Sequence, residues 1–260
     1  MAVIILVCFL ASVIGSICGV GGGVIIKPVL DAFGIMSVSA ISFLSSCTVL
    51  AMSCTNLYKN ARSGNSQIRV RTTLPLAIGG AVGGVTGKVL FNMISAQFEN
   101  ANQIGAIQAA ILALACVMIL VYTLNRSRIR TYQVTNAAVC FIIGIFLGMI
   151  SSFLGIGGGP IDLVVLYFFF SMSTKEAAQN SIFIIFFAQL ANLIYTILSG
   201  TVPYFSMMFL VIMICAGISG GIAGSSINKK IDEKTVDKLF AGLVIVIIVI
   251  NIYNIFKYIG

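Results

Sequence analysis

Long apolar stretches separated by short polar segments run through the whole chain of 260 residues. Each stretch is continuously apolar rather than alternating, which favours buried or membrane-embedded helices over β-strands. The helices predicted in the first half of the chain cover 3–17, a short segment ending at 33, 40–57, 72–94 and 104–124. Those predicted in the second half cover 137–154, 161–170, 180–198, 204–227 and 238–258.

The composition places these helices in a membrane. Hydrophobic residues make up 59% of the chain and charged residues 8%, and the mean hydropathy is +1.11, whereas soluble chains carry about 25% charged residues. We therefore expect an all-α polytopic protein of the plasma membrane. The first eleven residues resemble the core of a signal peptide but lack a basic leader and a cleavage site, so we interpret them as part of the first helix.

The net charge of +8 indicates how the chain is oriented in the membrane rather than binding to nucleic acid. The Lys and Arg residues are concentrated in short connecting loops, which is the pattern that the positive-inside rule gives to cytoplasmic loops. We therefore expect the lipid bilayer, and no nucleic acid, as a partner.

Two glycine runs interrupt apolar stretches, GVGGG at 19–23 and GIGGG at 155–159. Consecutive glycines break a helix because each costs roughly 1 kcal/mol relative to alanine. Broken backbone is tolerated inside a membrane only where protein covers it or where it lines a polar cavity. Each break also exposes the amides and the positive dipole end of the helix that follows, which is a site for an anion.

The two glycine runs belong to an internal repeat. A shift of 136 residues places 19–23 on 155–159, Ser45 on Ser181 and Asn56 on Asn192. We therefore divide the chain into a first repeat at 1–125, a basic linker at 126–136 and a second repeat at 137–260. Each repeat contains a helical hairpin broken at the glycines and three further transmembrane helices.

The relative orientation of the repeats depends on the first break. If 3–33 forms a hairpin, the repeats are inverted, and the loops 58–71, 125–133, 171–178 and 227–238 share one side of the membrane. If 3–33 is one broken crossing helix, the repeats are parallel. The hairpin places most of the basic residues on one side, so the charge distribution favours inverted repeats, an architecture typical of transporters.

The sequence pattern resembles the TauE/SafE family, also called the sulfite exporter family. The resemblance lies in a helix followed by GxGGG and an apolar half-helix, repeated after a glycine-rich helix. The loops 62–65 (RSGN) and 199–202 (SGTV) are similar to the short turns of that family. Membership implies a permease for small anions, often sulfur-containing. The chain departs from the usual pattern at Lys27, before Pro28, and at the segment 160–162 (PID).

Substrate-binding candidates come from the breaks and from the helices that follow them. Backbone amides at the breaks would bind an oxyanion, although the glycines could instead serve only tight packing of the hairpins. The polar side chains could line the path or merely bond neighbouring helices. The candidates are Gly21, Gly22, Gly23, Gly157, Gly158, Gly159, Ser45, Asn180 and Ser181, with Asn56, Gln189 and Asn192 as further path-lining residues.

Lys27 and Asp162 are the two charged residues placed deepest in the predicted helices. An ionisable residue there costs about 2.5–3.5 kcal/mol on insertion scales and is therefore a functional candidate. We expect Lys27 to attract the anion and Asp162 to couple proton movement to transport. The alternatives are a structural pair between them, or a Lys27 side chain that reaches the interface. We expect Asp31 to lie near the surface at a helix end.

The sequence contains no nucleotide-binding loop, catalytic triad or cluster of metal ligands. We therefore expect no enzyme and no cofactor, but a secondary transporter of a small anion such as sulfite or an organosulfonate. Protons are the candidate coupling ion, and the mechanism is alternating access. An uncoupled anion channel and a non-transporting assembly protein are the alternatives.

Overall fold

The computed structural model describes residues 2–64, 66–95, 97, 101–156 and 158–259, and these residues form helices and loops only. The first half contains α1 (Ala2–Cys18), α2 (Gly23–Phe33), α3 (Val38–Arg62), α4 (Val70–Ser95) and α5 (Ala101–Asn125), followed by the 3₁₀ turn η1 (Arg126–Arg128). The second half contains α6 (Ala137–Phe153), α7 (Pro160–Phe170), α8 (Thr174–Leu198), α9 (Met207–Lys230) and α10 (Glu233–Ile259).

Six of the described helices are long and apolar enough to cross a membrane, namely α3, α4, α5, α8, α9 and α10. The other apolar helices are shorter because the glycine runs interrupt them. The prediction of an all-α polytopic membrane protein is confirmed.

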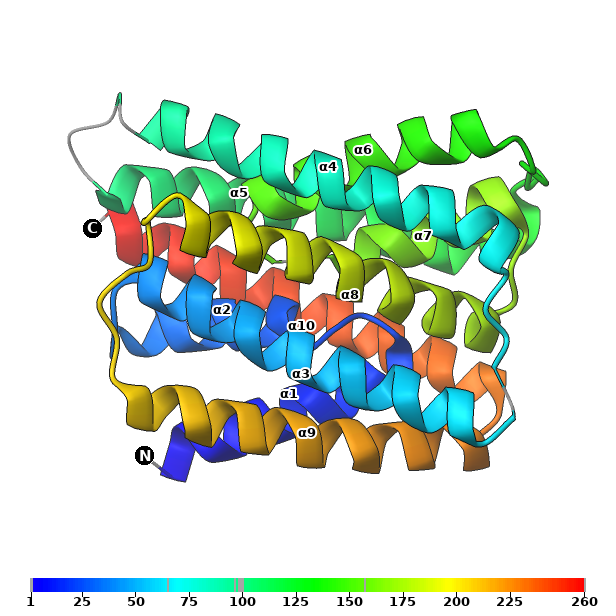
Figure 1. Ribbon diagram of the computed structural model, residues 1–260, viewed down its shortest axis with the longest axis horizontal. Helices are drawn as coiled ribbons and strands as arrows, with labels where there is room; N and C mark the ends of the chain where they lie inside the picture. The colour runs from blue at the N-terminus through cyan, green and yellow to red at the C-terminus, as the bar shows by residue number, and fades with distance from the viewer. Residues whose placement is uncertain (1, 65, 96, 98–100, 157, 260) are drawn as a thin grey trace.

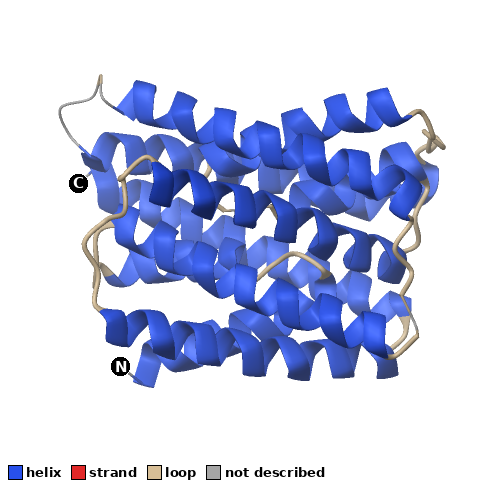
Figure 2. Cartoon of the chain, viewed as in Figure 1, coloured by secondary structure: helices blue, strands red, loops and turns tan. Residues whose placement is uncertain are grey.

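The chain follows the hairpin alternative for the first break, and 3–33 is not one broken crossing helix (Figure 1). Helix α1 starts at the end of the bundle that holds both termini and runs inward, and α2 returns to that end. Helix α6 starts at the opposite end, and α7 returns there. The two halves therefore run in opposite senses. Figure 2 shows the loop between α1 and α2 inside the bundle rather than at its surface. That the halves are copies of one unit stays a prediction.

The four loops predicted to share one side lie together at the end away from the termini. An ion pair joins Arg69 to Glu176, and the hydroxyl of Ser173 donates to Glu233 Oε1 at 2.8 Å. The ammonium of Lys229 donates to Ser63 Oγ at 2.9 Å. We refer to this end as the basic-loop end and to the opposite one as the terminal end.

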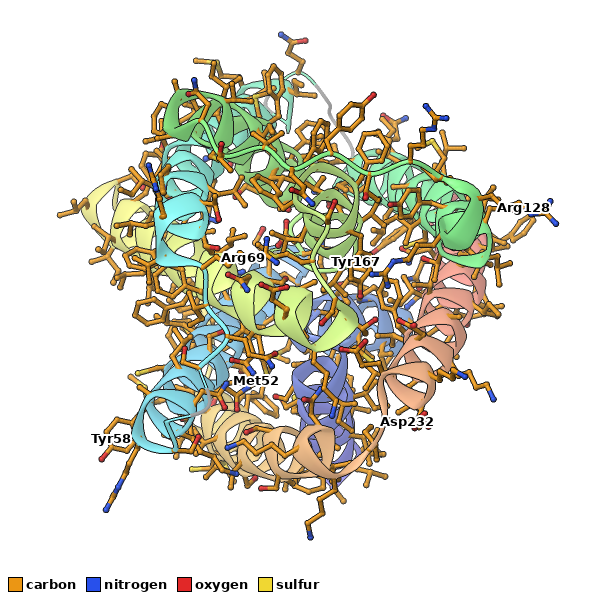
Figure 3. The ribbon with its side chains drawn as sticks, turned by 90° about the vertical axis from the view of Figure 1, so that its right-hand side faces the viewer. Met52, Tyr58, Arg69, Arg128, Tyr167 and Asp232 are labelled. Carbon is orange, nitrogen blue, oxygen red and sulfur yellow. The ribbon has the colours of Figure 1, made fainter. Side chains whose placement is uncertain are left out.

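An aromatic and ionic cluster closes the middle of the basic-loop end. The Arg126 guanidinium lies 3.8 Å from the centre of the Tyr167 ring and 3.7 Å from Asp237 Oδ1. Figure 3 looks onto this end and shows Tyr167 toward the middle, whereas Arg128 and Asp232 lie on the rim.

The glycine-rich helices pack against the opposite half, α4 on α6 and α9 on α1. A Cβ at Gly83 would overlap the carbonyl of Ile145 on α6, and one at Gly224 would overlap that of Val13 on α1. The small residues therefore let the backbones touch, as expected in lipid. Figure 1 places these two pairs at opposite edges of the bundle. Exposed apolar side chains such as Val82 cover their outer faces.

Matching hydrogen bonds occur in the two halves. Asn56 Nδ2 on α3 donates to Ser16 Oγ on α1 at 2.8 Å, and Asn192 Nδ2 on α8 donates to Ser152 Oγ on α6 at 2.7 Å. Both residues of the second pair lie 136 positions after those of the first. This correspondence supports the predicted repeat.

Candidate functional site

The two helix breaks meet in the interior of the bundle. A methyl group at Gly23 would lie 3.0 Å from the carbonyl oxygen of Ile156, and one at Gly159 would lie 3.1 Å from that of Val20. The described glycines of both breaks are buried except Gly155, which is half-buried. Gly157 lies outside the described residues. The breaks are therefore far from the ends of the bundle, as the anion-site hypothesis requires.

The N-terminus of α2 has no side-chain cap. The amides of Gly22, Gly23 and Val24 donate to no acceptor within the described part of the chain, as expected for the first turn of a helix. Two serine hydroxyls lie beside this turn. Ser12 Oγ and Ser45 Oγ are each 3.2 Å from the place that a methyl group would take at Gly22 and Gly23, respectively. Amide and hydroxyl donors therefore gather at this point.

The N-terminus of α7 differs because it is already capped. The carboxylate of Asp162 accepts a hydrogen bond from the amide of Gly159 at 3.2 Å, and Pro160 occupies the first turn. Gly159 has φ +126°, a conformation that a residue with a side chain rarely adopts. The expectation of two bare amide ends therefore needs correction at α7. Substrate binding at either end stays a prediction.

Lys27 contacts the end of another broken helix and does not pair with Asp162. Its ammonium donates to Gln108 Oε1 at 2.9 Å and to the carbonyl of Leu154 at 3.0 Å. Gln108 Nε2 in turn donates to the carbonyl of Phe153 at 2.6 Å. Lysine and glutamine thus satisfy carbonyls left free at the end of α6. Lys27 is only 4% exposed, so it does not reach the interface either.

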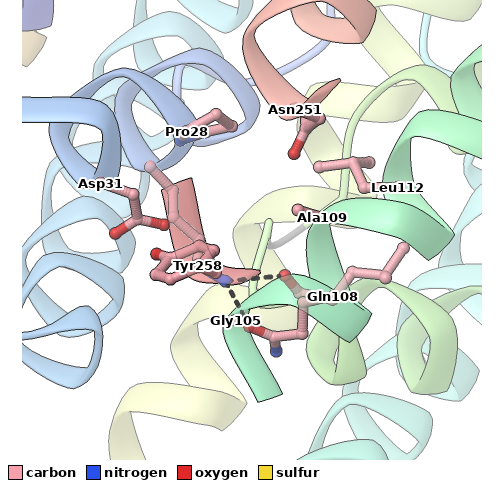
Figure 4. Close-up of a pocket in the computed structure, with 10 residues that line it drawn as sticks. Pro28, Asp31, Gly105, Gln108, Ala109, Leu112, Asn251 and Tyr258 are labelled. Atoms are coloured by element: carbon pink, nitrogen blue, oxygen red, sulfur yellow. Dashed lines mark hydrogen bonds between the residues drawn. The ribbon is translucent and has the colours of Figure 1, made fainter. Parts of the chain in front are cut away.

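A cavity of about 10 Å³ lies beside Lys27, which is room for roughly one water molecule. Figure 4 shows Asp31 of α2 on one side of it and Gln108 of α5 on the other, with Asn251 of α10 above them. Tyr258 of α10 also lines this cavity. Asp31 lies near the end of α2, as expected; it is half-buried and lines this cavity.

The remaining candidates occupy several environments. Asn180 is fully engaged: its Oδ1 accepts from the amide of Arg69 at 3.0 Å and from Thr73 Oγ1 at 2.5 Å, and its Nδ2 donates to two carbonyls. These bonds fasten the loop before α4 to α8. Ser181 Oγ is buried without a partner among the described residues.

The path-lining candidates are also buried. The Oδ1 atoms of Asn56 and Asn192 have no hydrogen-bond partner in the described part of the chain. They lie against Gly221 and Gly84, in each case from the opposite half. Gln189 is 1% exposed on α8. A role for these residues in the path stays a prediction.

Sequence reasoning missed three residues at the breaks. They are Ser12, Gln108 and Asn228, whose Nδ2 donates to the carbonyl of Ile17 at the end of α1 at 2.5 Å. A polar residue isolated inside an apolar segment was the available signal for Ser12 and Gln108. For Asn228 no such signal exists, because it lies among the polar residues at the end of α9. Among the described residues, no three His, Cys, Asp or Glu side chains are close enough to hold a metal ion.

Interrupted helices that meet inside a bundle of apolar helices are typical of membrane transporters. Here the buried ammonium of Lys27 lies beside them. Residues 4–250 match the model of the family described as "Sulfite exporter TauE/SafE", and the chain belongs to this family. It is therefore a multi-pass membrane transporter, for which the plasma membrane is the expected location.

A curated relative supports this assignment. The chain is 22% identical to the "Probable membrane transporter protein YunE" of Bacillus subtilis (strain 168) over 277 aligned positions, which cover 94% of each chain. No solved structure matches the chain significantly.

Proposed function

We propose that the protein is a secondary transporter that moves a small oxyanion, sulfite or an organosulfonate, by alternating access and with protons as the coupling ion. The observation that carries this proposal is the uncapped N-terminus of α2, buried where the two breaks meet. The name of the family, sulfite exporter, supports the choice of anion.

The chemistry around α2 suits an oxyanion. Free amides at a helix N-terminus and the positive end of the helix dipole favour a negative guest. The hydroxyls of Ser12 and Ser45 add two donors beside these amides. Lys27 lies one turn after Gly23 and thus on the same face of α2, which places a positive charge near the same point.

The arrangement of the halves suits alternating access. Their broken helices run in opposite senses and meet in the middle (Figure 1), so rocking of one half against the other would open the breaks to each end in turn. In this structure, Tyr167 and Arg126 pack together at the basic-loop end. The cavity beside Lys27 lies toward the terminal end, where α2 and α10 finish.

Proteoliposomes containing the purified protein test the proposal. Uptake of labelled sulfite and of labelled methanesulfonate is measured with and without a pH gradient. We expect saturable uptake that the gradient accelerates. Uptake that neither saturates nor responds to the gradient would identify an uncoupled channel. No uptake of either anion would contradict the proposed function.

Substitutions at the breaks locate the site. Gly22→Leu should abolish uptake because even a methyl group there would press against Ser12, so the larger side chain must displace the donors around the break. Gly158→Leu tests the second break. Gly242→Leu is the matched control, since Gly242 has open space around it on α10. Normal uptake by both the Gly22 and the Gly158 variants would show that the site lies elsewhere.

A further inference from the structure

Asp31 is a half-buried carboxylate near the end of α2. It lies in the last turns of α2 and lines the cavity beside Lys27. Its Oδ1 atom is buried and has no hydrogen-bond partner among the described residues. A buried carboxylate oxygen without a donor is costly, and binding a proton removes that cost by neutralising the group.

Lys27 shares the cavity with Asp31 without forming an ion pair with it. The two residues lie one turn apart on the same face of α2. Within the described part of the chain, no nitrogen–oxygen contact of 4.0 Å or less joins them. The ammonium is held instead by Gln108 and Leu154. Each charge is therefore close enough to sense the other, while the space between them fits a water molecule.

The residues that line the cavity reach from the terminal end toward the breaks. Asp31, Gly105 and Tyr258 belong to helix ends at the terminal end of the bundle, and Leu154 adjoins the second break. A proton that enters from the terminal end would therefore reach Asp31 before the breaks.

Asp31 is the one carboxylate among the described residues that line the cavity. On its own helix it faces Lys27, and α10 contributes Lys257 and Tyr258. The ammonium of Lys257 donates hydrogen bonds to the backbone carbonyls of Asp31 and Ala32 at the end of α2. The lining residues from α5 and the end of α6 carry no titratable group.

We propose that Asp31 binds the proton that is coupled to transport. Once Asp31 is neutral, it no longer balances the positive charge of Lys27, which then attracts the anion. The inference rests on the proposed function and replaces Asp162 as the coupling residue. A proton from water at the terminal end adds to the carboxylate and leaves one net positive charge in the cavity. The anion then binds near Lys27 and the N-terminus of α2. After the halves rock, the anion leaves and the carboxyl returns its proton to water at the basic-loop end.

Transport by the full-length protein in liposomes tests the coupling. The probe is labelled methanesulfonate, whose charge does not change near neutral pH. A gradient of one pH unit should drive roughly tenfold accumulation by the wild type if one proton accompanies each anion. Asp31→Asn should still exchange labelled for unlabelled anion but should lose accumulation. Asp232→Asn, on the rim of the basic-loop end, is the matched control and should behave as the wild type.

Two results would overturn the assignment. One is full accumulation by Asp31→Asn, and the other is its loss in Asp162→Asn but not in Asp31→Asn. An infrared pH titration decides the same question without transport: a carboxyl band of the wild type should be missing from Asp31→Asn, and its persistence would refute the proposal. A wild type that moves neither anion would instead contradict the proposed function.

Discussion

The ammonium of Lys27 on α2 donates a hydrogen bond to the backbone carbonyl of Leu154, 3.0 Å away and 127 residues later in the chain. This contact joins the first hairpin to the break of the second. Gln108 completes the link, since it accepts from Lys27 and donates to the neighbouring carbonyl of Phe153. The Lys27 side chain therefore satisfies a free carbonyl at the end of α6 and supplies the positive charge proposed to attract the anion.

Lys27→Met should lower the initial rate of sulfite uptake roughly tenfold or more, because a hydrogen bond to a charged group contributes about 1.5–3 kcal/mol. It also leaves the carbonyl of Leu154 without its donor. Lys88→Met is the control: Lys88 donates to Thr196 Oγ1 at 2.6 Å, away from the breaks. Equal rates for the wild type and the Lys27 variant would argue against a role for this charge.

Gly83→Ala should lower the melting temperature of the purified protein in detergent. A methyl group there overlaps the carbonyl of Ile145, so α4 and α6 must separate, and such overpacking costs about 1–3 kcal/mol. Gly242→Ala should be neutral or stabilising by up to about 1 kcal/mol, because the site is open and alanine favours helix. The idea of close backbone packing fails if the Gly83 variant melts no earlier than the Gly242 variant.

The two Asn–Ser bonds should have similar coupling energies. Double-mutant cycles with Asn56→Ala and Ser16→Ala, and with Asn192→Ala and Ser152→Ala, should each give about 0.6 kcal/mol and at most about 1.7 kcal/mol. Unfolding of the purified variants in denaturant provides the measurement. A clear coupling in one half and none in the other would weaken the case that the bonds are equivalent.

The terminal end should face the extracytoplasmic side. The basic loops lie at the other end of the bundle, and such loops remain in the cytoplasm. A topology reporter fused after the last residue should therefore read extracytoplasmic, and one inserted beside Asp232 should read cytoplasmic. The reverse pattern would invert the orientation, and identical readings at both positions would contradict the course of α10.

The helices and their interruptions followed from the sequence because apolar stretches and glycine runs act locally. Helix ends were predicted less well. Helix α8 begins at Thr174 rather than 180, because Ser173 and Glu176 form a capping box. Helix α3 continues to Arg62 rather than 57, and Lys59 there donates to the carbonyl of Ile222 on α9. Polar residues read as loop can thus extend a helix when they have a partner.

The site was harder to predict, since its contacts depend on which segments meet. Lys27 and Asp162 were the correct residues to single out as deeply buried charges. Asp162 accepts from Gly159 three residues earlier, which is a local contact at the start of α7. The partners of Lys27, Gln108 and Leu154, depend instead on how α2 packs against α5 and α6. Spacing along one sequence contains no such information.

The carboxylate of Asp162 makes the two hairpins unequal, because it caps the start of α7 whereas α2 has no side-chain cap. On the predicted repeat the two breaks would offer two equivalent anion sites, but at α7 the carboxylate of Asp162 already accepts from the amide of Gly159. On the proposed mechanism, each polypeptide would then carry a single anion per cycle, always beside the first hairpin. The second hairpin would bind no anion and would serve as the part of the protein against which the first hairpin moves.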